Sequence, residues 1–148
     1  ETDRFSFEYN KGQTIKLKNA DRIGEIWFDI SDAEIDATIY CSYLPIDAEG
    51  LYRALEDSYH LAYSHVSVSE GINQRLVLND SLKTYATIYD IEGQVATPIQ
   101  VDVTETVSHF RRGSVDYNKA VKNDSVAQST NILRNDIMTL IESLRWKY

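Results

Sequence analysis

The stretch Ile35-Asp-Ala-Thr-Ile-Tyr-Cys-Ser-Tyr43 decides the fold, because apolar and polar side chains alternate along it. In an extended chain, one side receives the apolar series Ile35, Ala37, Ile39, Cys41 and Tyr43. The other side receives the series Asp36, Thr38, Tyr40 and Ser42. A period of two with β-branched and aromatic residues predicts a half-buried strand, which Pro45 helps to end.

Further strands are expected on both sides of this one. Before it, the candidates are the alternating Phe5, Phe7 and Tyr9, the pair Ile15 and Leu17, and Glu25–Ile30 with Trp27 and Phe28. After it, we expect strands over Asn73–Leu78, Thr84–Ile91, Val95–Val103 and Thr106–Tyr117. Short connections between them predict antiparallel neighbours.

Three residues or pairs add detail to the later strands. Glu92-Gly93 suits a two-residue hairpin turn. Pro98 lacks an N–H group, so its strand is expected at a sheet edge or with a bulge. Gly113 predicts a kink in the last strand.

Two segments change to a helical period. Within Gly50–Val66, one stripe of about 80° of arc holds Leu51, Leu55, Tyr59, Ala62 and Val66. This stripe is expected to be buried, and Asp47 or Glu49 would favour the helix dipole. The second helix is expected over Asp124–Trp146, capped by Asp124, with a buried stripe of Val126, Leu133, Ile137, Leu140, Ile141 and Leu144.

Together these elements predict an α+β fold in a single domain over residues 1–148. A mainly antiparallel sheet of about six to seven strands packs with two amphipathic helices in two or three layers. The order of elements resembles the PsbP/Mog1-like sandwich, and this likeness concerns shape alone.

The composition excludes several classes of protein. The chain has 148 residues, 43% of them hydrophobic, and a net charge of −8. No run approaches the roughly 18 apolar residues of a membrane span. A single cysteine excludes a disulfide framework, and the acidic charge argues against nucleic acid as a partner. The chain begins at Glu1 rather than Met, so any signal peptide or lipid anchor would lie upstream of it.

Recognisable catalytic motifs are absent from the sequence. No phosphate-binding glycine loop and no nucleophile-elbow serine occurs. Cys41 shares the phase of the apolar side of its strand, so we expect it to be buried rather than reactive. His60 and His65 are five residues apart, unlike a zinc-helix pair, and a metal site would need His109 as well. We therefore expect neither a metal nor a cofactor.

An acidic segment leaves a hydrolase open as one hypothesis. Residues 21–57 hold ten Asp or Glu residues against two arginines. Two carboxyls from residues 29–57, placed across a cleft, would support glycoside hydrolysis. We favour a solvated acidic surface instead.

Two aromatic and basic features remain. Ten tyrosines suit either the edge of a core or an interface, and we favour the core edge. Arg111 and Arg112 place one guanidinium on each side of a strand. The inner one is expected to find a carboxylate or carbonyl partner.

Several stretches together resemble the GldD family of gliding-motility lipoproteins from Bacteroidetes. They are Ile26–Ile30, Ala37–Tyr43, Leu51–His65, Tyr89–Gly93, Thr97–Gln100, Ser108–Gly113 with Tyr117, Leu133–Ile137 and Ser143–Lys147. The resemblance covers nearly the whole chain and implies an exported protein on the periplasmic face, held to the membrane by a lipid. It implies a role in gliding and type IX secretion and supplies no catalytic residues. In that phylum, Asp-Ser followed by an aliphatic residue resembles an O-glycosylation signal, which makes Ser81 and Ser125 candidates.

Three functions from different classes follow. The first is a non-enzymatic accessory subunit that contacts other envelope proteins of a motility or secretion complex. Its expected interaction patch comprises Trp27, His109, Arg111, Arg112 and Tyr117. The second is a module that binds a small molecule or glycan in an aromatic-lined pocket. The third is the hydrolase described above.

Overall fold

A seven-stranded antiparallel sheet lies at the centre of the structure, which is a computed structural model. The structure describes residues 5–9, 12–18, 24–64, 70–93, 95–118 and 126–147. The spatial order of the sheet is β2-β3-β4-β8-β7-β6-β5. The strands are β2 (Gln13–Lys18), β3 (Ile26–Asp32), β4 (Ala37–Pro45), β5 (Gly71–Asn79), β6 (Thr84–Glu92), β7 (Ile99–Thr104) and β8 (His109–Tyr117). The helices are α1 (Ala48–Tyr63) and α2 (Val126–Ser143), and a two-stranded sheet joins β1 (Phe5–Ser6) to β9 (Arg145–Trp146). The expected α+β fold is confirmed.

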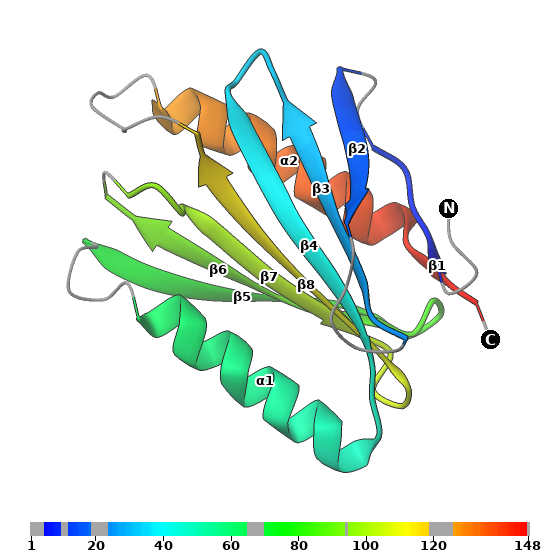
Figure 1. Ribbon diagram of the computed structural model, residues 1–148. Helices are drawn as coiled ribbons and strands as arrows, with labels where there is room; N and C mark the ends of the chain where they lie inside the picture. Colours follow the sequence, from blue (N-terminus) through cyan, green and yellow to red (C-terminus); the bar gives the residue numbers. More distant parts are fainter. Residues whose placement is uncertain are drawn as a thin grey trace.

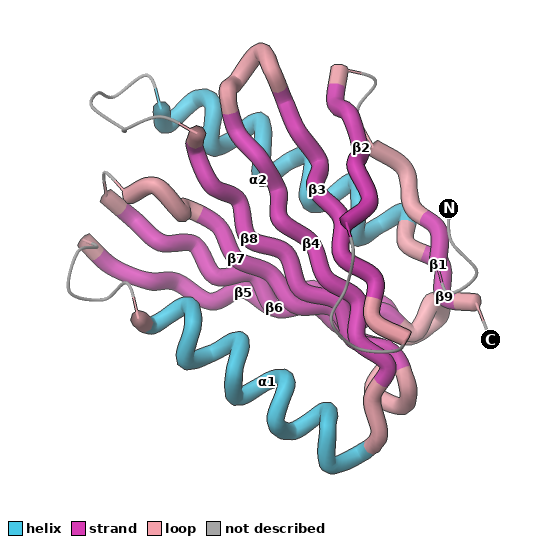
Figure 2. Tube along the Cα trace, viewed as in Figure 1, coloured by secondary structure: helices cyan, strands magenta, loops and turns pink. Residues whose placement is uncertain are grey.

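The two helices cover opposite faces of the sheet (Figures 1 and 2). On the face that packs against α2, strand residues such as Ile39 and Val101 are apolar. On the other face, α1 lies against β7 and β8, where Asp102 and Arg112 are register partners. The molecule is therefore a three-layer arrangement of helix, sheet and helix, with an apolar face and a polar face to one sheet.

The main core lies between the sheet and α2. The expected stripe is buried in the structure at Leu133, Ile137, Leu140, Ile141 and Leu144. The side chain of Val126 and the proposed cap Asp124 lie outside the described residues. The predicted end of the helix is wrong, because α2 stops at Ser143 and Arg145–Trp146 pairs with β1. Arg145 Nη1 donates hydrogen bonds to the carbonyls of Glu142 and Leu144, which satisfies this helix end.

The buried side of α1 matches the predicted stripe only in part. Ala62 is buried as expected, but the other buried residues are Ala54 and Ser58, which lie outside that stripe. Leu55 and Tyr59 are exposed, and His65 and Val66 lie outside the described residues. Small side chains let the helix lie close to the polar residues of the sheet. Asp47 caps the helix, because its Oδ1 accepts a hydrogen bond of 2.7 Å from the Gly50 N–H.

Three strand details also need correction. β7 lies in the interior of the sheet, and Pro98 directly precedes its first residue, where a missing N–H breaks no ladder bond. The connection from β6 to β7 spans residues 93–98 rather than two residues. β8 passes through Gly113 with unbroken pairing on both sides. A Cβ at Gly113 would lie 3.1 Å from Val101 Cγ1, so close packing rather than a kink requires this glycine.

Candidate functional site

The polar face of the sheet is built from two neighbouring rows of side chains that cross all seven strands. The first row, read from β2 to β5, is Lys18, Trp27, Ser42, Arg112, Asp102, Thr87 and Leu76. The second row is Lys16, Asp29, Tyr40, Ser114, Gln100, Tyr89 and Gln74. Because α1 lies over β7 and β8, it divides this face into a β2–β4 side that neither helix covers, a covered centre and a β5 side.

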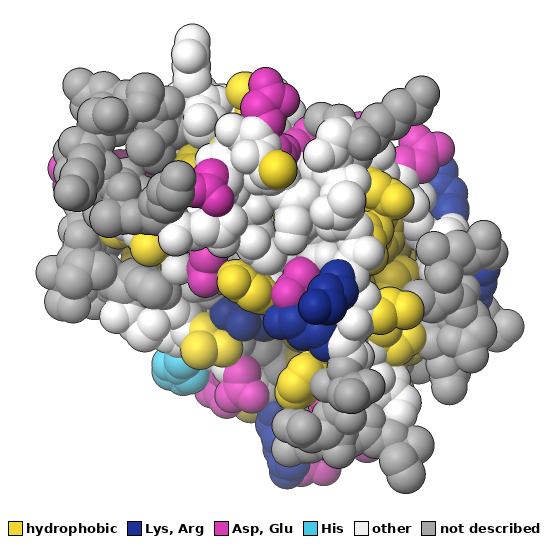
Figure 3. Space-filling view, turned by 45° about the horizontal axis from the view of Figure 1, so that its top comes forward, with side chains coloured by type: hydrophobic (Ala, Val, Ile, Leu, Met, Phe, Trp, Pro, Cys, Tyr) yellow, Lys and Arg dark blue, Asp and Glu magenta, His cyan; other side chains and the backbone are white. Residues whose placement is uncertain are grey.

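The uncovered side contains a pocket of about 230 Å³, which we call the Trp27 pocket. It is lined by Lys18, Trp27, Asp29, Tyr40, Cys41, Ser42, Arg112 and Ser114. Lys18 Nζ lies 2.8 Å from Asp29 Oδ2 and 5.1 Å from the centre of the Tyr40 ring. In Figure 3, cationic, acidic and apolar side chains lie next to one another near the middle of the view.

Two predicted interaction residues, Trp27 and Arg112, meet in this pocket. Arg112 Nη2 donates a 2.6 Å hydrogen bond to Gln100 Oε1. Burial lowers the pKa of Arg112, although Asp102 opposes that effect. The remaining guanidinium nitrogens have no hydrogen-bond acceptor among the described residues. A cation with unused donors therefore forms part of the pocket.

The centre of the face, under α1, buries a carboxyl group that the sequence analysis did not single out. Asp102 is 1% exposed, and its pKa is raised to about 6, first of all by burial, with Arg112 and Thr87 opposing the rise. Ser58 on α1 lies against this carboxyl, yet neither the Ser58 hydroxyl nor Asp102 Oδ2 has a hydrogen-bond partner of ordinary geometry among the described residues. A buried, incompletely paired acid costs folding free energy.

Few features of the sequence predict that these residues belong to a site. Asp102 alternates with Val101 and Val103 and therefore belongs to the polar phase of its strand, which normally faces water. Lys18 and Tyr40 also occupy ordinary outward positions of strands. The one feature that could have pointed to Asp102 is Arg112, the cation opposite it in register. That register is set by the tertiary structure and is not visible in the sequence.

On its other side, α1 forms an exposed apolar surface with the edge strand β5. This α1–β5 surface comprises Tyr52, Leu55, Tyr59, Leu76 and Leu78, and the two leucines of β5 are each 65% exposed. Tyr63 joins the two elements, because its ring stacks on Tyr59 at 4.4 Å and its hydroxyl accepts a hydrogen bond from Gln74. Clustered exposed apolar residues of this kind mark interaction sites.

His109 and Arg111 lie on the opposite face and are buried, so they cannot belong to an exposed patch with Trp27. The guanidinium of Arg111 lies 4.3 Å from the centre of the Phe5 ring and 4.7 Å from that of Phe7. The prediction of a carboxylate or carbonyl partner is wrong, because no described residue accepts a hydrogen bond from the Arg111 guanidinium, and its Nε is buried without a partner. Cation–π contacts replace it. His109 stacks on Trp146.

The other candidate positions are also separate from the Trp27 pocket. Tyr117 lies at the end of β8, where its hydroxyl is hydrogen-bonded to Thr130 of α2. Ser81 is exposed in the turn between β5 and β6 and donates a hydrogen bond to Asn79. Ser125 lies outside the described residues. The structure therefore brings together two of the five expected interaction residues.

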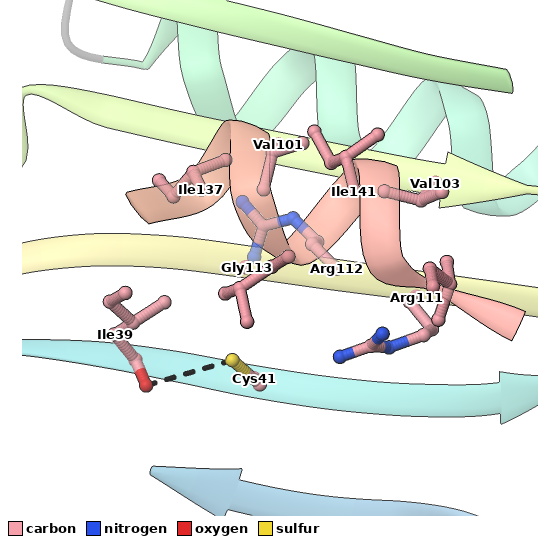
Figure 4. Close-up of a pocket in the computed structure, with 11 residues that line it drawn as sticks. Ile39, Cys41, Val101, Val103, Arg111, Arg112, Gly113, Ile137 and Ile141 are labelled. Atoms are coloured by element: carbon pink, nitrogen blue, oxygen red, sulfur yellow. Dashed lines mark hydrogen bonds between the residues drawn. The ribbon is translucent and has the colours of Figure 1, made fainter. Parts of the chain in front are cut away.

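Cys41 lies on the apolar side of its strand beside a small interior cavity (Figure 4). The cavity measures about 40 Å³, which is room for no more than a few water molecules. Its walls include Ile39, Val101 and Ile137. Burial raises the pKa of the Cys41 thiol to about 12, although Arg111 opposes that rise.

We therefore expect the Cys41 thiol to be unreactive in the folded protein. Only the thiolate is nucleophilic, and at pH 8 a pKa near 12 leaves almost none of it. A disulfide reagent should react at least about 100-fold more slowly with the native protein than with the protein in denaturant. Equal rates in the two states would contradict the buried position.

The acidic residues of the hydrolase hypothesis serve separate local structures. Asp29 pairs with Lys18, Asp32 accepts a hydrogen bond from the Ile35 N–H in a turn, and Glu49 pairs with Arg53 on α1. A groove of about 540 Å³ at the start of α1 includes Asp47 and Asp57, but Asp47 is occupied as the helix cap. Among the described residues, no three His, Cys, Asp or Glu side chains gather to hold a metal ion.

Comparison with known proteins gives one family. The sequence model of the family described as gliding motility lipoprotein GldD matches residues 1–146. No curated protein and no solved structure matches the chain, so the PsbP/Mog1-like shape stays a prediction. Within the part of the chain that the structure describes, neither helix has the length and apolar character needed to cross a membrane.

Proposed function

Because the chain belongs to the family of the gliding motility lipoprotein GldD, we propose that it is a non-enzymatic accessory component of gliding-motility and type IX secretion machinery. The family is that of a membrane-anchored lipoprotein of the cell envelope with a role related to gliding motility. In our proposal the protein lies on the periplasmic face and acts through contacts with other envelope proteins.

The α1–β5 surface is the observation that supports contact with proteins. Its large apolar side chains remain exposed, although apolar residues on a helix usually face the sheet. Strand β5 is also at the edge of the sheet, where its outer backbone groups are open to pairing with another chain. A partner that covers both elements would bury the leucines and tyrosines together.

A pull-down from the native envelope tests this proposal. The tethered protein should recover components of the motility or secretion machinery, and the double variant Tyr59→Ser, Leu76→Ser should lose them. Interface residues of this size typically contribute more than about 1 kcal/mol each when they are central, so recovery should fall at least about tenfold.

Ile132→Ser is the matched control, because Ile132 is an equally apolar, exposed residue on α2, on the other side of the molecule. It should leave recovery unchanged. Recovery of unrelated abundant proteins alone, or equal losses in both variants, would contradict contact through the α1–β5 surface.

A further inference from the structure

Several hydrogen-bond donors of the Trp27 pocket have no acceptor in the part of the chain that the structure describes. Arg112 donates to Gln100 through one nitrogen, and its other nitrogens meet no acceptor among the described residues. Neither the Trp27 indole N–H nor the hydroxyls of Tyr40 and Ser42 bond to any described residue. A pocket that offers several donors is suited to a ligand that accepts hydrogen bonds.

The charge of the pocket also favours an anion. Lys18 and Arg112 are cationic, and Asp29 is the one acidic residue among the described residues of the lining. Asp29 is paired with Lys18 at 2.8 Å, whereas the acid that acts most strongly on the Arg112 guanidinium, Asp102, is buried under α1 outside the lining. This local excess of positive charge occurs in a chain with a net charge of −8. The net charge of the whole protein would repel an anion, so attraction of an anion to this pocket depends on the local arrangement of side chains.

The size and walls of the pocket limit what the anion is attached to. Pockets for drug-sized ligands measure about 300–1,000 Å³, so 230 Å³ admits a smaller group, such as one sugar ring or one amino-acid residue. Trp27 and Tyr40 supply aromatic surface, which packs against a weakly polar body. A doubly charged phosphate would be less suited, because Asp29 lies in the same lining.

We infer that the Trp27 pocket binds an organic carboxylate carried on a small ring or residue. Arg112 holds the carboxylate through paired N–H donors. Trp27 and Tyr40 contact the apolar side of its body, and Ser42, which is opposite Arg112 in register, contributes a hydroxyl. This function lies beyond the proposed protein contacts, since the pocket and the α1–β5 surface flank α1 on different sides.

Two sources share this chemistry, an acidic sugar and the terminal residue of a peptide. The test is an NMR titration of the two tryptophan indole N–H signals with glucuronate and with N-acetylalanine. Glucose and N-acetylalanine amide are the neutral counterparts, and inorganic phosphate tests for a simple anion site. Trp146 is an internal control, because its indole N–H already donates to the Lys83 carbonyl.

We expect a saturable shift of the Trp27 signal with at least one of the two acids and none with its neutral counterpart. Saturation by glucuronate alone assigns an acidic sugar, and saturation by N-acetylalanine alone assigns a peptide terminus. Arg112→Gln should weaken binding at least about tenfold, as expected for the loss of charged hydrogen bonds. Arg75→Gln removes the same charge from the exposed edge strand and should change nothing.

Ser42→Asp keeps the test decisive if Arg112→Gln does not fold. Its carboxylate would lie opposite Arg112 in register and occupy the guanidinium from within the protein, so binding should again fall at least about tenfold. The inference is overturned if neither acid gives a saturable Trp27 shift below about 50 mM. Equal shifts with the neutral counterparts, saturation by phosphate alone, or unchanged binding in the variants overturns it too.

Discussion

Replacement of Asp102 by Asn should raise the free energy of unfolding by about 3 kcal/mol at pH 8 and leave it unchanged near pH 4. The folded-state pKa of Asp102 is about 6, whereas an unfolded aspartate has a pKa of about 3.9. Between these values the folded protein holds a proton that the unfolded chain releases. The free energy of unfolding is therefore highest below about pH 4 and falls as the pH rises toward 6. Asn cannot ionise, so the variant does not lose this stability.

Urea unfolding of both proteins at pH 4 and pH 8 measures the effect. Glu34→Gln, in an exposed turn, is the control and should change stability by less than about 0.5 kcal/mol at either pH. The contrary result is a difference in the free energy of unfolding between Asp102→Asn and the native chain that is the same at both pH values. That result would show that Asp102 is ionised to the same extent in the folded and the unfolded protein. That outcome would contradict a buried, poorly paired carboxyl under α1.

Replacement of Phe5 by Ala should lower the free energy of unfolding by about 3–5 kcal/mol. Phe5 is 1% exposed, and its ring packs against Phe28, Tyr43 and the Arg111 guanidinium at 6.1, 5.3 and 4.3 Å respectively. Truncation opens a cavity and removes a ring from the buried cation. It also weakens the pairing of β1 with β9, because Phe5 is a register partner in it.

Two further variants separate these causes in the same unfolding measurement. Phe5→Leu keeps most of the volume and loses the aromatic face, so it should lose about 1–2 kcal/mol. Tyr9→Ala, at a position that is 45% exposed, should change stability by less than about 0.5 kcal/mol. A loss below 1 kcal/mol for Phe5→Ala would mean that β1 does not close over the core.

The local pattern of apolar and polar residues was sufficient to predict most of the strands and the buried side of α2. Period-two alternation around Ile39, Cys41 and Tyr43 matches their burial in β4, and the stripe through Leu133, Ile137 and Leu140 matches the core side of α2. Both predictions rest on strongly apolar residues, whose side chains are favoured away from water. The helix end beyond Ser143 and the position of Pro98 depended on which strands are neighbours, and pattern does not supply that information.

The candidate site was much less predictable. Trp27 and Arg112 were identified by residue type, but Lys18 and Tyr40 joined them only because β2, β3, β4 and β8 are neighbours in the sheet. His109 and Arg111 have the same polar character in sequence, yet they are buried on the other face. Polar residue type alone does not distinguish a solvated position from a covered one.

The sequence by itself determined which side chains share a face of each strand, because the pleat alternates them regardless of the neighbours. It also determined that the chain forms an antiparallel sheet with two helices and that it resembles the GldD family. The tertiary structure alone decided what covers each face. Helix α1 buries its small residues against the polar face and leaves Leu55 and Tyr59 outside, because the sheet beneath it presents Asp102 and Gln100 rather than an apolar surface. Burial is a property of two surfaces in contact, and one strand or helix specifies only its own half.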